Sequence, residues 1–268
     1  MEMVFFNSAH IEAFISSAKA EGWLTGRREI EFLLGAYSEG CLVYLSAGKP
    51  AAFITAISYA RSAWIGNLLV LPAYRQRGIG RSLMEKVLAG LDRSGCETVW
   101  LTASAAGAHL YKTLDFVQID RVQRWRGSGT AALRIDSLAC TASVASIDCL
   151  GWGDDRRAIF EALPENCSCF RAHDGFLVHL PSGDGQQLGP WGAVSKETAA
   201  YLLATAIGKE GAGGEIFLDV PEKNRAAEEL LSLRGFSVSG STLLMYRGRI
   251  PEYRAEYIYS LASMGSYG

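Results

Sequence analysis

Apolar and polar residues recur along this chain with two different periods, and the change between them is clearest near residue 75. Residues 64–71 form an almost continuous apolar run, which is typical of a buried strand, and Pro72 ends its hydrogen-bond ladder. Beyond Arg81 the apolar positions return every three or four residues, as they do on one face of a helix. The pattern predicts a strand, a short loop and an amphipathic helix whose apolar face carries Leu83, Met84, Val87, Leu88 and Leu91.

The other elements of the N-terminal half follow from the same patterns. Alternating residues on either side of a Gly-containing turn at 47–49 predict a hairpin. The mixture of strands and helices indicates an α/β fold with a mixed sheet. The expected elements are a strand at 4–7, helices near 10–20 and 27–36, hairpin strands at 41–46 and 51–59, a strand at 98–102 and a helix within 103–116.

The loop before the amphipathic helix has the composition of a phosphate-binding loop. Gly78 and Gly80 stand at the helix start, where backbone N–H groups have no partner within the helix and the helix dipole favours negative charge. Without side chains at these two positions, an anion can approach the N–H groups closely. Arg75, Arg77 and Arg81 add positive charge around the same point. These features predict a cradle for a pyrophosphate group.

The pattern V-x-P-x-Y-R-x-R-G-x-G-R, from Val70 to Arg81, resembles the acetyl-CoA motif of the GNAT superfamily of N-acetyltransferases. Its spacing differs from that of a dinucleotide GxGxxG fingerprint and of a GxxxxGKS/T loop, and the alternative is an ordinary turn that opens a surface helix. The resemblance implies that acetyl-CoA is the acyl donor and that N–H groups of residues 68–70 bind the thioester oxygen. The implied acetyl-CoA contacts are Leu68, Leu69, Val70, Gln76, Arg77, Gly78, Ile79, Gly80 and Arg81.

A second segment, ASAAGAHLYKTLDF at residues 103–116, resembles the A-T-x-x-G-x-x-L-Y-x-x-L-G-F helix of the same superfamily. The resemblance implies that Tyr111 protonates the thiolate as it leaves, which is a task suited to a nearby acid. The alternative is that Tyr111 only packs in the core. Asp115 replaces the usual Gly, and we expect it to adopt the left-handed conformation that ends the helix.

The group that removes a proton from the acceptor amine is missing from its two usual places. Thr102 stands where many members of the superfamily carry an acidic residue, and Asn67 on the preceding strand is also uncharged. Neither side chain has a useful pKa for a base. Asp219, Glu222 and His173 are titratable candidates in the C-terminal half.

The C-terminal half repeats part of the N-terminal half. Residues 215–248 and residues 98–127 both read as strand, helix, Asp/Gly-Phe and strand. Leu231 occupies the position that corresponds to Tyr111, so the proposed acid is absent from the repeat. The strand-to-helix junction at 188–203 has no RxxGxG, and its Ser and Glu residues indicate ordinary helix capping, with Ser195 and Glu197 in those roles.

The repeat predicts two tandem GNAT-like domains. We expect residues 1–128 to form the acetyl-CoA-binding N-acetyltransferase domain and residues 143–268 to form a degenerate GNAT-like domain that binds substrate. The GPW, FLDVPxxN and RGF segments of the C-terminal half also resemble the second domain of tandem GNAT proteins.

Composition restricts the partners. The 268 residues carry a formal net charge of −2, which gives no electrostatic footprint for nucleic acid or membrane. No apolar run approaches the roughly 20 residues needed to span a bilayer, and the N-terminus lacks the basic and apolar regions of a signal peptide. The expected partners are acetyl-CoA and an amine acceptor, and the expected compartment is the cytoplasm. Neither composition nor charge predicts an oligomeric state.

The cysteines are expected to be structural, and no metal is expected. Cys167, Cys169, His173 and His179 offer soft and imidazole ligands within a short stretch. Neither a CxxC nor an HxxxH spacing is present among them, and buried Cys behaves as a small hydrophobe. The six cysteines of the chain also suit a reducing compartment.

The resemblance implies N-acetyl transfer from acetyl-CoA to a primary amine of a small molecule or peptide. The amine would attack the thioester directly, because no cysteine lies at a matching catalytic position. Two alternatives remain: a non-catalytic acyl-CoA sensor that signals through the second domain, and an acyltransferase that uses a longer acyl-CoA.

Overall fold

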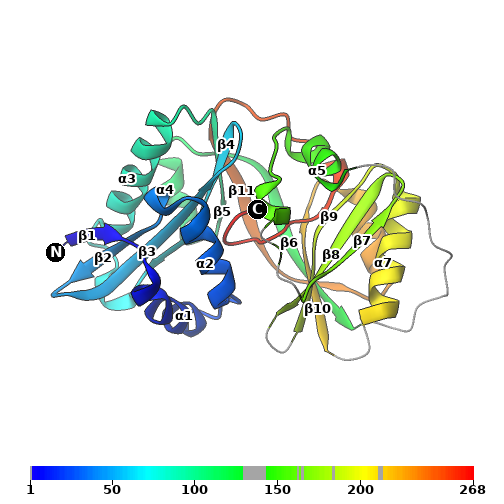
Figure 1. The fold of residues 1–268 in the computed structure, drawn as a ribbon, viewed down its shortest axis with the longest axis horizontal. Coiled ribbons are helices and arrows are strands. Elements are labelled where there is room, and N and C mark those ends of the chain that lie inside the picture. The colour runs from blue at the N-terminus through cyan, green and yellow to red at the C-terminus, as the bar shows by residue number, and fades with distance from the viewer. Residues whose placement is uncertain (1, 129–142, 162, 164–165, 183–184, 211–213) are drawn as a thin grey trace.

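Twelve strands form one continuous sheet that is bent into two lobes (Figure 1). The structure is a computed structural model, and it describes all residues except 1, 129–142, 162, 164–165, 183–184 and 211–213. Strands β1 to β5 belong to the N-terminal lobe, and β7 to β10 belong to the C-terminal lobe. Within the described residues, no helix is long and apolar enough to cross a bilayer.

The N-terminal lobe confirms the elements that the hydrophobic pattern predicts. Only the first strand is displaced: it lies two residues earlier than expected, because the side chain of Asn7 caps the turn that follows and accepts from the N–H of Ala9 at 3.1 Å. The elements are β1 (Glu2–Phe5), α1 (Ile11–Ala20), α2 (Arg27–Ala36), β2 (Leu42–Ser46), β3 (Lys49–Ser58), β4 (Ser62–Val70), α3 (Ile79–Arg93), β5 (Thr98–Ala103), α4 (Ala108–Lys112) and β6 (Val117–Ser128).

Two cores lie on opposite faces of this part of the sheet, because successive side chains of a strand point to opposite sides. Ile54 of β3 packs in the core that contains Leu83 and Met84 of α3. Its neighbour Phe53 packs in the core that contains Phe14 of α1. Helices α1 and α2 therefore cover one face of the sheet, and α3 and α4 cover the other.

The C-terminal lobe repeats the last three elements of the N-terminal half. β10, α8 and β11 correspond to β5, α4 and β6, so the structure contains the internal repeat that the sequence predicts. The elements are α5 (Val144–Trp152), α6 (Ala158–Glu161), β7 (Ser168–Ala172), β8 (Gly175–Ser182), β9 (Gly185–Ala193), α7 (Lys196–Glu210), β10 (Glu215–Pro221), α8 (Arg225–Leu233), β11 (Ser237–Gly248) and β12 (Ile258–Ser260).

The last long strand of each half lies in the sheet of the other half. β11 pairs with β5 of the N-terminal lobe, and β6 pairs with β10 of the C-terminal lobe. The order across the middle of the sheet is consequently β5-β11-β6-β10. The division into domains 1–128 and 143–268 stays a prediction, and each lobe uses a strand that the other half of the sequence supplies.

Candidate active site

A fork opens in the sheet between β4 and β5. The parallel pairing of these strands ends at Trp64 and Trp100, although β4 stays paired with β3 as far as Val70. Asn67 lies just beyond the last pair and has a φ of 53°, at an irregularity in the pairing of β3 with β4. Since β5 continues beside β11 to Ala103, the carboxyl ends of β4 and β5 diverge.

The backbone of β4 presents N–H groups to this fork. The N–H of Leu71 donates to the carbonyl of Ala51 on β3 at 3.0 Å. Because N–H directions alternate along a strand, Leu69 also faces β3, whereas Leu68 and Val70 face the fork. Two of the three expected thioester contacts on β4 therefore direct their N–H groups into the opening, and that of Leu69 does not.

The loop after β4 leads into a helix whose first N–H groups are available to a ligand. Gln76 and Gly78 adopt left-handed conformations, with φ values of 60° and 77°. The first helical bond in α3 runs from the N–H of Ser82 to the carbonyl of Gly78 at 3.0 Å. The N–H groups of residues 79–81 therefore precede the helical ladder, and the first turn carries no acidic residue. This arrangement suits an anion.

The three arginines near the loop have different roles. Arg77 is exposed and lies over the ring of Tyr74, with its guanidinium 5.7 Å from the ring centroid. Arg81 is half-exposed, forms an ion pair with Glu85 at 3.3 Å and donates to the hydroxyl of Thr113 at 2.5 Å. Arg75 instead donates to the backbone of β4. Arg77 and Arg81 remain the cationic groups with which this loop could meet a pyrophosphate.

Gly80 marks the point at which β4, α3 and α4 meet. A Cβ atom at this position would lie 3.5 Å from Val70, 3.7 Å from Leu110 and 3.9 Å from Leu68. The structure therefore brings the expected acetyl-CoA contacts of β4 and of the loop together, and it places α4 beside them.

Tyr111 lies on α4 and is 9% exposed. Its ring contacts that of Phe116 edge to face, with 6.0 Å between the centroids. Burial raises the pKa of Tyr111 to about 12, so the phenol keeps its proton at neutral pH. Asp115 has a φ of 65°, which confirms the expected left-handed helix end, and the N–H of Phe116 donates to the carbonyl of Tyr111 at 3.1 Å.

The C-terminal lobe has the same left-handed turn at the end of its helix, but it lacks the tyrosine. Gly235 has a φ of 77°, and the N–H of Phe236 donates to the carbonyl of Leu231 at 3.1 Å. Leu231 thus takes the place of Tyr111 in the repeat. The side chain of Ser195 accepts from the N–H of Thr198 at 3.2 Å, which confirms the capping role expected at the start of α7.

One acetyl-CoA is expected per chain, because only the N-terminal half combines the fork, the glycine loop and the tyrosine. Calorimetric titration of the full chain should reach saturation at one equivalent. Two equivalent sites would show that the junction before α7 binds phosphate without a glycine loop.

A segment from the C-terminal half covers the other side of the fork. The N–H of Asn67 donates to the carbonyl of Gly265 at 3.0 Å, and the hydroxyl of Thr102 donates to the carbonyl of Met264 at 2.5 Å. A Cβ atom on Gly66 would lie 2.3 Å from the same Gly265 carbonyl, so only glycine permits this contact. Figure 1 shows this end of the chain between the two lobes. The sequence carries no pattern that predicts this placement.

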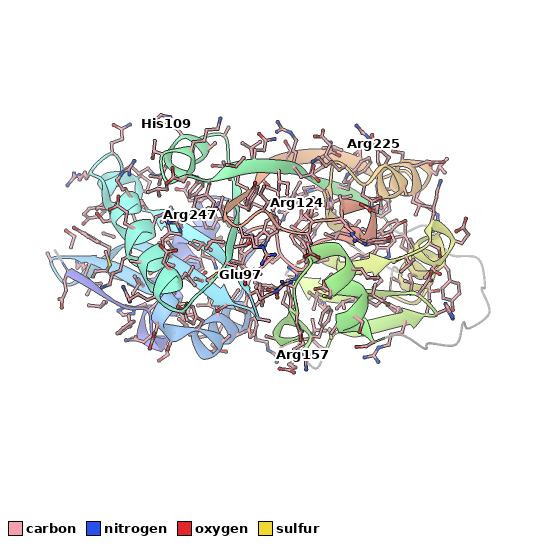
Figure 2. The ribbon with its side chains drawn as sticks, turned by 90° about the horizontal axis from the view of Figure 1, so that it is seen from above. Glu97, His109, Arg124, Arg157, Arg225 and Arg247 are labelled. Carbon is pink, nitrogen blue, oxygen red and sulfur yellow. The ribbon has the colours of Figure 1, made fainter. Side chains whose placement is uncertain are left out.

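The base candidates of the C-terminal half lie elsewhere. Asp219 on β10 is fully buried, and both of its carboxylate oxygens accept from Arg124 of β6 at 2.8 Å. Figure 2 shows Arg124 near the middle of the molecule. Glu222 contacts Gln123 on β6 at 3.2 Å. His173 lies in the turn between β7 and β8, at the far edge of the sheet. The pairing of Asp219 with Arg124 argues against Asp219 as the base, and that role stays a prediction without structural support.

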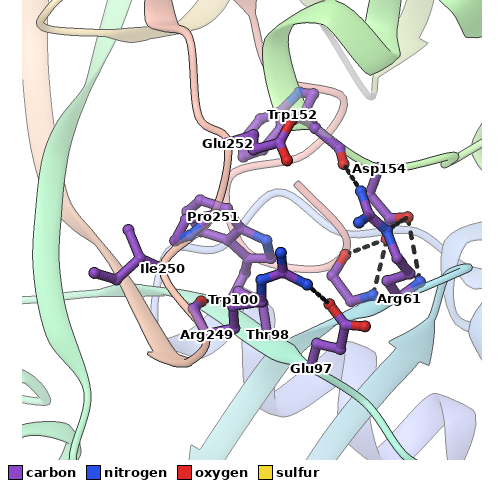
Figure 3. A pocket seen from close by; sticks show the side chains of 12 residues that line it. Arg61, Glu97, Thr98, Trp100, Trp152, Asp154, Arg249, Ile250, Pro251 and Glu252 are labelled. Carbon is purple, nitrogen blue, oxygen red and sulfur yellow. Dashed lines mark hydrogen bonds and ion pairs between the residues drawn. The ribbon is translucent and has the colours of Figure 1, made fainter.

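A small pocket lies between the two lobes (Figure 3). It is at the amino ends of β4 and β5, whereas the fork is at their carboxyl ends. Asp154 accepts from the backbone N–H of Ser62 at 2.8 Å and from its hydroxyl at 2.7 Å. Arg249 forms an ion pair with Glu97 at 2.9 Å on the other wall. These partners satisfy one another, so we assign this pocket to contact between the lobes. In the part of the chain that the structure describes, no group of three or more His, Cys, Asp or Glu side chains is placed to hold a metal ion.

The split mixed sheet with a helix N-terminus at its opening suits a CoA thioester, and comparison with known proteins identifies the family. The Acetyltransferase (GNAT) family model matches residues 8–116, and an Acetyltransferase (GNAT) domain model matches residues 144–260. The chain belongs to the GNAT acetyltransferases, with two such domains in tandem, and it is an acyltransferase of this type.

Among curated relatives, "Holothin acyltransferase" of Pseudoalteromonas sp. (strain SANK 73390) is 23% identical over 261 residues, which are 92% of this chain and 88% of that protein. The "[Ribosomal protein bS18]-alanine N-acetyltransferase" of Escherichia coli (strain K12) is 36% identical over 72 residues, 26% of this chain and 49% of that enzyme. The crystal structure of "A Putative Acetyltransferase from PYROCOCCUS HORIKOSHII" has a TM-score of 0.87 at 25% identity and covers 100% of this chain and 95% of that one.

Proposed function

We propose that the protein transfers the acetyl group of acetyl-CoA to a primary amine of a small molecule or peptide. The observation that carries this proposal is the convergence at Gly80, where the fork of β4, the first turn of α3 and the helix of Tyr111 meet. The family uses acetyl-CoA, and the curated relatives include both an N-acetyltransferase and an acyltransferase.

Different groups at the fork bind the donor, stabilise the developing charge and donate a proton. The N–H groups of residues 79–81, with Arg77 and Arg81, bind the pyrophosphate. The N–H groups of Leu68 and Val70 stabilise the negative charge that develops on the thioester oxygen when the amine attacks. The phenol of Tyr111 donates its proton to the departing thiolate. The buried thiol of Cys41 has a pKa raised to about 11, which disfavours an acyl-cysteine intermediate at that position.

The test is acetyl transfer to a panel of primary amines, namely benzylamine, 2-phenylethylamine, putrescine and a peptide with N-terminal alanine. We expect amine-dependent release of CoA, measured with a thiol reagent, together with an acetylated amine found by mass spectrometry. Binding of acetyl-CoA without an acetylated product from any panel member would favour the sensor. A higher kcat/KM for hexanoyl-CoA than for acetyl-CoA would favour the longer acyl donor.

A further inference from the structure

The C-terminal half of the sheet contains a fork of its own, between β9 and β10. The parallel pairing of these strands ends after three residue pairs, at Gln187, and the pairing of β4 with β5 also ends after three pairs, at Trp64. Beyond this point β9 continues beside β8, and β10 continues beside β6. Gly189 therefore stands two residues beyond the last pair, in the position that Gly66 holds in the first fork. The two forks can be compared residue by residue.

The chain fills the second fork with its own strand. Ser260 of β12 pairs with Trp191 of β9, which corresponds to Leu68 of β4 when the last pairs of the two forks are aligned. The N–H of Leu261 donates to the carbonyl of Asp219 on β10 at 2.8 Å, so this part of the chain contacts both strands. β12 therefore occupies, in the second fork, the place that is proposed for the thioester of the donor in the first.

The chain then continues from the second fork into the first. A Cβ atom on Gly189 would overlap with the carbonyl oxygen of Leu261, and one on Gly66 would overlap with the carbonyl oxygen of Gly265. The corresponding glycines of both forks are thus covered by backbone carbonyls from one short stretch of chain. Within the described residues, however, no strand pairs with Leu68 on the fork side of β4. The first fork is closed at its glycine and keeps the place of the donor free of a strand.

Three hydrogen bonds hold residues 264–266, here called the wall segment, in the closed end of the first fork. The N–H of Asn67 donates to the carbonyl of Gly265 at 3.0 Å. The hydroxyl of Thr102 on β5 donates to the carbonyl of Met264 at 2.5 Å, and the hydroxyl of Ser266 donates to Oδ1 of Asn67 at 3.3 Å. Asn67 and Ser266 are both buried. The wall segment therefore bridges the two strands where they diverge.

The acyl group of a donor would point toward this closed end. With the pyrophosphate at the start of α3 and the thioester beside Leu68, the CoA arm runs inward along β4, and its acyl chain continues toward Asn67. Residues of a strand lie about 3.3 Å apart, so Gly66 is only about 7 Å from Leu68. The wall segment stands within this interval. A methyl or ethyl group fits in front of it, whereas an extended hexanoyl chain would meet its carbonyls.

We propose that the wall segment sets the length of the acyl group, and that β12 holds the wall segment in place from the second fork. The donors of this fork are then acetyl-CoA and propionyl-CoA, and hexanoyl-CoA is excluded. The inference rests on the proposed acyl transfer and adds the residues that select the donor. It also gives the degenerate half a task, because a fork that binds the chain's own strand fixes the segment that shapes the other fork.

A donor series of acetyl-, propionyl-, butyryl- and hexanoyl-CoA tests the wall segment, with the panel amine that is acetylated fastest as acceptor. The wild-type kcat/KM should fall by about 100-fold or more from acetyl-CoA to hexanoyl-CoA, because one methylene too many already costs about 10-fold. The double variant Thr102→Val with Ser266→Ala removes two of the three hydrogen bonds and leaves every proposed donor contact in place. Its ratio of hexanoyl to acetyl kcat/KM should rise by about 10-fold or more. A chain that ends at Ser263 should raise this ratio further.

Thr98→Val is the matched control. Thr98 lies at the other end of β5, and its hydroxyl donates to the carbonyl of Arg249 at 2.8 Å, so the substitution removes the same kind of bond to the C-terminal half. Its donor ratio should stay within about twofold of the wild-type ratio. A variant that is merely destabilised would lose activity with all four donors in the same proportion, so the ratio separates donor selection from a structural role.

The outcomes distinguish the wall segment from the proposed function. A wild-type protein that uses acetyl-CoA and hexanoyl-CoA equally well would overturn the role of the wall segment. So would a preference for acetyl-CoA that is unchanged in the double variant and in the shortened chain. If the shortened chain does not fold, the double variant decides alone.

A wild-type protein that binds acetyl-CoA but acylates no panel amine would instead overturn the proposed function. Calorimetry then tests the wall segment without turnover. Hexanoyl-CoA should bind the wild type more weakly than acetyl-CoA does and should gain affinity in the double variant. Equal affinities of the two donors for the wild type would overturn the role of the wall segment.

Discussion

Gly78→Asp is expected to weaken acetyl-CoA binding by about 100-fold or more, which corresponds to about 2.7 kcal/mol. The new carboxylate would stand at the N-terminus of α3, where it would itself accept from the free N–H groups and occupy the positive end of the helix dipole that the pyrophosphate needs. Like charge would then face the pyrophosphate. Isothermal calorimetry on the purified variant measures the loss, and circular dichroism checks that the protein remains folded.

Gly48→Asp provides the matched control for backbone strain. Gly48 lies in the β2–β3 turn with a φ of 74°, close to the 77° of Gly78, and a Cβ atom meets no atom within 4 Å at either position. Each substitution should therefore carry a similar strain of about 1–2 kcal/mol. Only the substitution in the loop should change acetyl-CoA affinity. Equal affinities in the two folded variants would refute the phosphate-binding assignment.

Tyr111→Phe should lower kcat by about 10²-fold while the dissociation constant for acetyl-CoA changes by less than about twofold. The substitution keeps the ring, and with it the edge-to-face contact with Phe116, but it removes the proton that the thiolate would take. Because burial raises the pKa of Tyr111 to about 12, the wild-type phenol stays protonated up to that pH. The loss in the variant should therefore be nearly constant between about pH 6 and 9.

Steady-state kinetics with a saturating amine measure this effect, and Tyr246→Phe serves as the comparison. Tyr246 lies on β11, where its ring packs against that of Trp100, so it loses a hydroxyl without approaching α4. Undiminished turnover by Tyr111→Phe would assign the proton to water or to another acid.

The conformation of the loop proposed to bind acetyl-CoA could be predicted because it depends on local chemistry. A left-handed conformation at Gly78 and a helix start at Ile79 follow from residues that are neighbours in sequence. The same holds for Asp115, since Asn and Asp are the non-glycine residues that enter this conformation at modest cost. The roles of Tyr111 and of the N–H groups at Leu68 and Val70 stay predictions, although the structure places them around one opening.

The acceptor side could not be predicted in this way. Asp219 was a reasonable candidate by its position in the repeat, but its strand pairs with β6, and Arg124 on that strand takes both carboxylate oxygens. The contact of Gly265 with Asn67 gave no signal in the sequence either, because it joins residues that lie far apart along the chain.

The sequence by itself determined the elements of the N-terminal half, the tandem repeat and the conformation of the glycine loop, because hydrophobic period, glycine conformation and helix-end chemistry act over a few residues. The tertiary structure decided the order β5-β11-β6-β10 and the placement of Gly265 and Ser266 against Asn67. Strand partners and long-range contacts depend on which surfaces remain to be buried once the lobes have formed. No local pattern contains that information, and the contacts that cover the fork depend on it.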